Sequence, residues 1–181
     1  VVRRDELEEG EKQKSWLKIL VVKDLKSKAI FAHVVKQKGV DEEGYAVARL
    51  LEDIQWLGYT RMILKADNER AIVRLLHESL RRIKAEGVEQ AAQECPPSYD
   101  SRSNGSIENA VKQVQGLLRT LKLSLEARVK KKVPNKHAIM SWMVEHVSWL
   151  LTARVRGTDG RTSYHRIRGR AFARRLLEFG E

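Results

Sequence analysis

The chain has 181 residues and a mass of 20.8 kDa, which is enough for one ordinary domain and too little for two full-sized ones. Hydrophobic residues make up 42% of it, so a core can form, and this argues against wholesale disorder. No apolar run reaches the roughly eighteen residues of a membrane-spanning helix, so we expect no membrane span. A single cysteine, Cys95, excludes an internal disulfide and a multi-cysteine zinc site, and it fits an intracellular compartment.

The net charge of +11 is unevenly distributed along the chain. Residues 1–100 carry 18 Lys and Arg against 18 Asp and Glu, whereas residues 101–181 carry 17 against 6. Basic charge gathered in one region is typical of proteins that bind a polyanion such as nucleic acid. The alternative interpretation is a solvated surface that only favours solubility.

The first half of the chain alternates between strand and helix patterns. Residues 1–15 are polar and predict an N-terminal arm, with no apolar signal-peptide core and no starting Met, so we expect a fragment. Asp41 is expected to cap the first helix and Gly58 to end it. The expected elements are strands at 16–23, 28–35 and 61–66, helices at 41–57 and 69–84, and a short strand at 88–93.

The second half is predicted to be helical. After a loop at 95–106, six apolar residues step by three or four and predict a long helix that ends at the lysines 130–132. A further helix is expected at 137–153, in which Trp142 and Trp149 pack in the core and His146 is partly buried. The six residues of the long helix are Ile107, Val111, Val114, Leu118, Leu121 and Leu125. The fold class is therefore α/β with a helical C-terminal half.

Two carboxylates lie where acidic ligands often occur. Asp67 follows a predicted buried strand, and Glu108 lies in the first turn of the long helix. Carboxylates from two such elements can converge on one hard cation such as Mg²⁺. Taken alone these positions also suit ordinary exposed acids, because a helix dipole favours Glu in the first turn.

The surroundings of these two acids resemble a known family. The segment KILVVKDLKSKAIFAHVV resembles the second and third strands of the integrase catalytic core of retroviruses and LTR retrotransposons, members of the DDE superfamily. LKADNE resembles its strand with the second acid, and SRSNGSIENAVKQVQGLLRTLK resembles its Asn-Gly-x-x-Glu helix with the third acid. GTDGRTSYHRIRGR is similar to the downstream Gly-x-Thr-Pro-Tyr…Gly-Arg block. The four blocks keep the family's order over residues 16–170.

The resemblance implies a ribonuclease H-like mixed sheet flanked by helices and metal-dependent DNA 3′-end processing and strand transfer. It places the second and third acids of the triad on Asp67 and Glu108, which would hold Mg²⁺ or Mn²⁺. Lys112 matches the family's contact to the DNA end, and Gln115, Arg119 and Lys122 continue along the same helix face. The implied partners are element-end and target DNA and further copies of the chain, with no membrane partner, and the implied location is the nucleus.

The sequence departs from the family in four places. Glu69 stands where Gly is frequent, Ser163 stands where Pro is usual, and the 40 residues between Asp67 and Glu108 exceed the typical spacing. Most importantly, only two strands precede the first helix, so we expect the first strand and its acid to lie upstream of Val1. Asp5 and Asp24 are the alternatives for that acid, although Asp24 matches the Asp-x-x-Ser-Lys turn and 1–9 is too polar for a central strand.

These expectations define three regions and two functions. The regions are an arm at 1–15, an N-terminally truncated integrase-like core at 16–132, and a helical and basic extension at 133–181. One function is that of an integrase core fragment, inactive by itself because its first acid is missing. The alternative is a domesticated or inactive nucleic-acid-binding module of the same fold.

Overall fold

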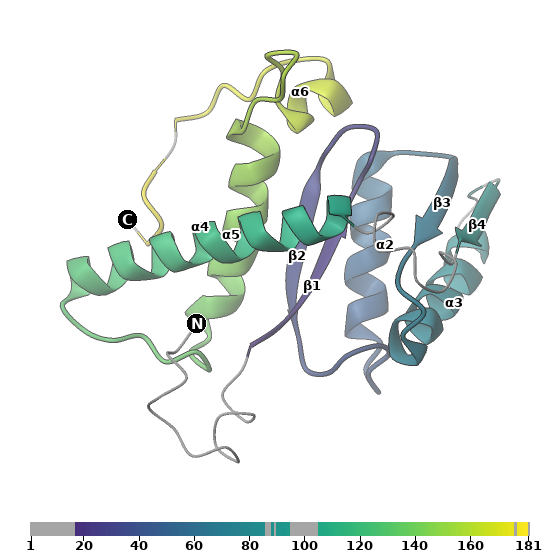
Figure 1. The fold of residues 1–181 in the computed structure, drawn as a ribbon, viewed down its shortest axis with the longest axis horizontal. Helices are drawn as coiled ribbons and strands as arrows, with labels where there is room; N and C mark the ends of the chain where they lie inside the picture. Colours follow the sequence, from purple (N-terminus) through teal and green to yellow (C-terminus); the bar gives the residue numbers. More distant parts are fainter. Residues whose placement is uncertain (1–16, 86–87, 89, 95–104, 176, 181) are drawn as a thin grey trace. The chain divides into compact units, whose positions relative to one another are not determined.

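The computed structural model describes residues 17–85, 88, 90–94, 105–175 and 177–180 (Figure 1). It divides into two compact units. We call Val35–Asn109 the central unit and Val1–Val34 with Ala110–Glu181 the terminal unit. The elements in chain order are β1 (Lys18–Lys23), β2 (Ile30–Val35), α2 (Tyr45–Leu57), β3 (Arg61–Lys65), α3 (Arg70–Ala85), β4 (Gln90–Glu94), α4 (Gly105–Val129), α5 (Ile139–Arg154) and α6 (Ser163–Arg168).

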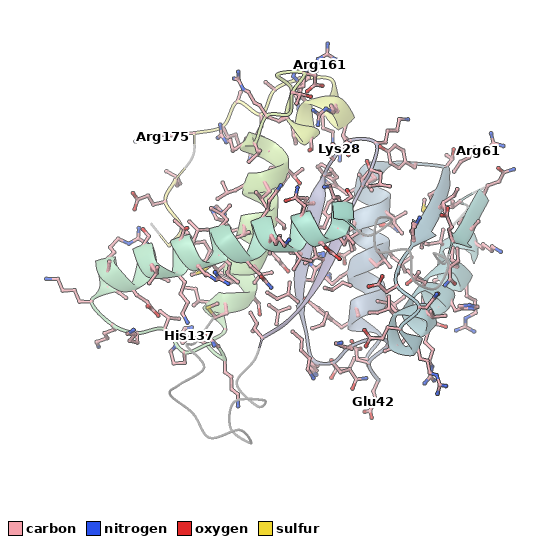
Figure 2. All side chains as sticks on the ribbon, viewed as in Figure 1. Lys28, Glu42, Arg61, His137, Arg161 and Arg175 are labelled. Atoms are coloured by element: carbon pink, nitrogen blue, oxygen red, sulfur yellow. The ribbon has the colours of Figure 1, made fainter. Side chains whose placement is uncertain are left out.

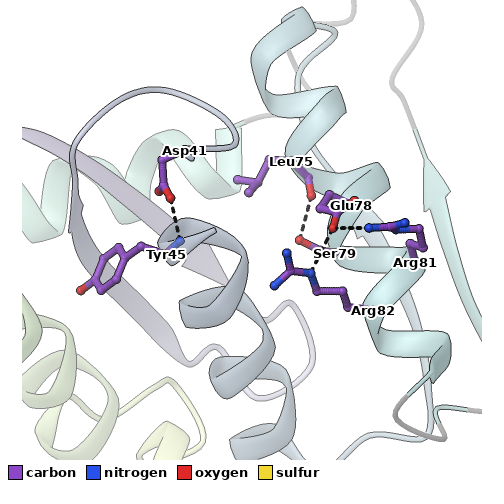
Figure 3. Close-up of polar contacts among 7 residues, drawn as sticks. All are labelled: Asp41, Tyr45, Leu75, Glu78, Ser79, Arg81 and Arg82. Carbon is purple, nitrogen blue, oxygen red and sulfur yellow. Dashed lines mark hydrogen bonds and ion pairs between the residues drawn. The ribbon is translucent and has the colours of Figure 1, made fainter. Parts of the chain in front are cut away.

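The central unit contains a parallel strand pair connected through a helix. β3 pairs with β4 in register from Arg61 opposite Gln90 to Lys65 opposite Glu94. Parallel strands need a crossover connection, and α3 provides it while packing against both β4 and α2. The apolar faces of α2 and α3 supply the unit's buried residues, including Val47, Leu75 and Ile83. Inside α3, the Ser79 hydroxyl donates to the Leu75 carbonyl oxygen at 2.7 Å, so this buried hydroxyl is satisfied (Figure 3).

Asp41 stabilises the start of α2, although from a different position than predicted. The helix begins at Tyr45, and its N-cap is Gly44, which has a left-handed backbone at φ 66°. Asp41 lies before the cap, and its carboxylate accepts the N–H group of Tyr45 at 2.7 Å (Figure 3). It also accepts the N–H group of Ala46 at 3.2 Å. The predicted N-cap is therefore wrong by three residues, but Asp41 still binds the unpaired N–H groups of the first turn. Gly58 ends α2 in the left-handed conformation, as predicted.

In the terminal unit, β1 and β2 form a hairpin with a braced turn. The Asp24 carboxylate accepts hydrogen bonds from the Ser27 N–H at 2.7 Å and from the Ser27 hydroxyl. Lys28 has a left-handed backbone at φ 68°, and its N–H donates to the Asp24 carbonyl. Asp24 and Ser27 thus hold the turn together, in agreement with their interpretation as the Asp-x-x-Ser-Lys turn.

Helix α5 covers the backbone of β2. The Thr152 hydroxyl accepts the Ile30 N–H and donates to the Ile30 carbonyl, both at 2.9 Å, and it is buried. One threonine therefore pairs with both backbone polar groups of a buried strand residue. The next helix, α6, contacts α5, where Trp149 meets the rings of Tyr164 and Phe172 edge-on at centroid distances of 5.8 and 5.2 Å.

Helices α4 and α5 share an apolar cluster. Leu125 of α4 packs with Met140 and Met143 of α5, and half-buried neighbours including Leu118 and Leu121 complete the cluster. These contacts cross residue 132, where we place the end of the integrase-like region, and that boundary remains a prediction. No described helix is long and apolar enough to cross a membrane.

Two packing predictions are wrong. Trp142 is 74% exposed rather than in the core. The buried face of α5 consists of other residues, including Met140, Met143 and Val147. The ribonuclease H-like sheet implied by the resemblance also predicts that the strand preceding Asp67 pairs with the strand that contains Val21 and Val22. Among the described residues, the strands instead form two separate pairs, β1 with β2 and β3 with β4.

Candidate active site and nucleic-acid face

Asp67 lies at the carboxyl edge of the β3–β4 pair. It follows β3 after one intervening residue, and its side chain is exposed. Both parallel strands end at this edge, where Lys65 and Glu94 form an ion pair at 2.9 Å. In open α/β sheets this edge is where ligands bind, because the loops that follow the strands are free to vary there.

The residue that departs from the family pattern beside Asp67 has a structural role. Glu69 precedes α3, and its backbone carbonyl accepts the N–H groups of Ile72 and Val73 at the start of the helix. Its carboxylate contacts the Lys38 ammonium at 3.1 Å. Glu69 therefore joins the loop before α2 to the start of α3.

Glu108 lies in the first turn of α4, as predicted, and its side chain is exposed. The helix begins at Gly105, inside the segment predicted as loop, while residues 95–104, including Cys95, lie outside the described residues. Asp67 and Glu108 belong to the same central unit. Over residues 35–109 the sequence has 11 Lys and Arg against 13 Asp and Glu, whereas residues 110–181 have 16 against 5.

The two acids offer the right donor chemistry for a hard divalent cation. Both are exposed carboxylates within one compact unit of slight negative charge, and Mg²⁺ takes one or two protein carboxylates and keeps waters elsewhere. Within the described residues, no group of three or more His, Cys, Asp or Glu side chains could hold a metal ion. The motif blocks make Asp67 and Glu108 the candidate pair, and Asp5 lies outside the described residues.

The face of α4 that follows Glu108 carries exposed polar side chains. Lys112, Gln115 and Arg119 are exposed, and none makes a side-chain hydrogen bond or ion pair with a described residue. They share a face with Glu108 because they follow it by four, seven and eleven residues on a continuous helix. Lys122 differs, because its ammonium donates to the Asn135 side chain at 2.7 Å and is partly buried. The part of this face that is available to phosphates ends at Arg119.

The downstream Gly-Thr-Asp-Gly-Arg block folds around one arginine. The Arg166 guanidinium donates to both Asp159 oxygens, at 3.1 and 2.5 Å, and to the Ser27 carbonyl at 2.9 Å. Arg166, followed by the Arg161 N–H, lowers the pKa of Asp159 to about 2. A Cβ at Gly157 would lie 2.2 Å from the guanidinium, so glycine makes room for it. Our sequence reasoning missed this arrangement, for which Asp-Gly was the available turn signal.

Comparison with known proteins gives structural matches. The chain superposes on the catalytic core domain of BIV integrase with a TM-score of 0.56 and 18% identity, covering 83% of this chain and 85% of that one. It superposes on a chain of the simian T-cell lymphotropic virus intasome in complex with PP2A regulatory subunit B56 gamma with a TM-score of 0.58 and 17% identity. That match covers 90% of this chain and 51% of the other, so this chain spans about half its length.

The chain has the fold of a retroviral integrase catalytic core. No protein-family model and no curated protein matches the sequence. At this low identity the likeness establishes the integrase-core fold, and the roles of individual residues need their own argument. The mixed α/β architecture with a helical C-terminal half is confirmed.

Proposed function

We propose that the chain is the catalytic-core region of a retroelement integrase, which in the full-length protein processes DNA 3′ ends and joins them to target DNA in the nucleus. The observation that carries the proposal is the integrase-core fold over most of the chain, combined with Asp67 after β3 and Glu108 in the first turn of α4. The identity of the acids comes from the motif blocks, and the exposure of both side chains supports it.

In this proposal Asp67 and Glu108 hold Mg²⁺ or Mn²⁺. The metal supplies activation of the attacking oxygen and stabilisation of the leaving oxygen when bound. Lys112, Gln115 and Arg119 bind the phosphates of the DNA end, because they follow Glu108 on one exposed helix face and have no described partner. The reaction needs a further acid, for which a position upstream of Val1, Asp5 and Asp24 remain the alternatives. Further copies of the chain complete the assembly on DNA.

A metal titration on the 181-residue chain tests the two acids. Paramagnetic Mn²⁺ should broaden NMR signals near Asp67 and Glu108, and Asp67→Asn or Glu108→Gln should each reduce that broadening. Glu42→Gln is the matched control, because Glu42 is an exposed carboxylate of the same unit whose side chain makes no hydrogen bond or ion pair with a described residue. Equal broadening in all variants would rule out this pair as a metal site.

Strand transfer by the full-length protein tests the third acid. Glu108→Gln should abolish end joining while metal-free DNA binding stays intact, because a metal ligand is lost and no phosphate contact is lost. A full-length Glu108→Gln protein that joins ends at the normal rate would show that Glu108 is not the third acid.

A second function is favoured by the distribution of charge. The basic excess lies in residues 110–181, apart from the two acids, so nucleic-acid binding does not require catalysis. A non-enzymatic binding module of the same fold would therefore bind DNA. The sequence of the parent gene upstream of Val1 distinguishes the two functions. An apolar strand with an Asp encoded there supports the enzyme, and its absence supports the binding module.

A further inference from the structure

Two loops at one end of the terminal unit carry a concentration of positive charge that the proposed function does not use. These are the β1–β2 turn, residues 24–29, and the segment 155–170 around α6. Together they contain seven Lys and Arg against two Asp. Figure 2 shows Lys28 and Arg161 at the same end of this unit.

Hydrogen bonds fix the two loops against each other. The Arg166 guanidinium donates to the Ser27 carbonyl at 2.9 Å and also binds Asp159, which in turn accepts the Arg161 N–H at 3.1 Å. Arg156 pairs with Thr162 in an antiparallel bridge, so the segment is itself a short, closed hairpin. The charged side chains therefore project from a rigid base, which reduces the entropy lost when they bind a ligand.

The acids of these loops are already engaged, whereas several of the basic groups are not. Asp24 binds Ser27 and Asp159 binds Arg166. Lys28, Arg156 and Arg161 are exposed, and their side chains make no hydrogen bond or ion pair with a described residue. Burial and the nearby Lys28 ammonium lower the pKa of Lys23, as expected where positive charge is concentrated.

We propose that Lys28, Arg156 and Arg161, the turn patch, bind the phosphate backbone of duplex nucleic acid at a surface separate from the α4 face. Guanidinium groups match phosphate oxygens in a bidentate geometry, and two of the three side chains are arginines. Binding to a membrane surface would need a wide apolar face beside the charges. The exposed large apolar side chains in these loops are Leu25 and Val155 alone. The proposal does not rest on Asp67 or Glu108.

The test is a salt titration of duplex binding by the 181-residue chain. A fluorescent random-sequence 20-base-pair duplex is titrated by anisotropy between about 50 and 200 mM salt. The test variant is K28N/R161Q, in which Asn suits the left-handed backbone at Lys28 (φ 68°). Losing two phosphate contacts should lower the salt slope by about two units and weaken binding about ten-fold or more at 0.1 M salt.

The matched control is R74Q/K84Q. Arg74 and Lys84 are exposed on α3 in the central unit and have no described partner, so this variant removes the same charge elsewhere. It should leave the salt slope nearly unchanged, and circular-dichroism melting should show that both variants stay folded. The readout is metal-free duplex binding, which separates this result from a failure of the proposed catalytic site.

Three outcomes would overturn the turn patch. The first is a salt slope of duplex binding for K28N/R161Q equal to that of R74Q/K84Q. Lys28 and Arg161 would then affect binding only through the net charge of the protein and not through phosphate contacts. The second is no duplex binding by the unmodified chain at 50 mM salt. The third is binding to vesicles of phosphatidylcholine with about 30% phosphatidylserine without binding to duplex, because the partner would then be a lipid surface.

Discussion

The attachment of α5 to β2 by Thr152 gives a prediction whose size follows from the structure. Thr152→Val keeps the shape of the side chain and removes the hydroxyl that bonds to both backbone groups of Ile30. Thr152 is 2% and Ile30 is 5% exposed, so water cannot replace the lost partner. Each buried polar group left unpaired costs about 1–3 kcal/mol, so losing the partner of both groups should cost roughly 2–6 kcal/mol of unfolding free energy. Domains of ordinary stability have about 5–15 kcal/mol in total.

Urea denaturation followed by circular dichroism measures this loss. With a slope of about 1–3 kcal/mol per molar urea, the unfolding midpoint of Thr152→Val should fall by about 1–2 M or more. Thr152→Ser is the matched control, because it keeps the hydroxyl and loses one methyl group, which costs about 1 kcal/mol. The Ile30 amide proton should also exchange faster in the Val variant, since its acceptor is gone. If the Val variant were as stable as the Ser variant, the two hydrogen bonds would not hold α5 on β2.

Three further outcomes are expected. Replacing Lys112 and Arg119 with Ala should weaken duplex binding in an anisotropy titration and lower its salt slope by about two units, and an unchanged slope would make this face of α4 plain solvated surface. The pKa of Asp159 is lowered to about 2, so its stabilising pairing with Arg166 is complete above the ordinary Asp pKa of 3.8 and lost as the pH falls toward 2. The melting-temperature difference between the unmodified chain and Asp159→Asn should therefore shrink over that interval, and a constant difference would contradict the pairing. Trp142→Ser should change the urea midpoint little, because the ring is 74% exposed, and a large loss would place Trp142 in a contact outside the described residues.

Local patterns in the sequence determined the secondary structure. Each predicted strand and helix has a counterpart in the structure, with ends displaced by a few residues. The spacing of apolar residues and the glycines at helix ends are local signals, so they indicate an element but not its exact first and last residue. The motif blocks led to the integrase-core fold that the structural matches show. The position of Glu108 in the first turn of α4 followed from the same local signals. The roles of Asp67 and Glu108 as metal ligands remain predictions.

Only the tertiary structure decided which distant groups meet. Thr152 and Ile30 are 122 residues apart, and Arg166 and Ser27 are 139 apart, so no periodicity relates the partners. The apolar pattern of α5 shows which residues can be buried. The elements that pack against the helix decide which of them are buried, and Trp142 stays exposed. Lys122 matches the spacing of the α4 face, yet Asn135 binds it, because a side chain's partners depend on the chain that returns beside the helix.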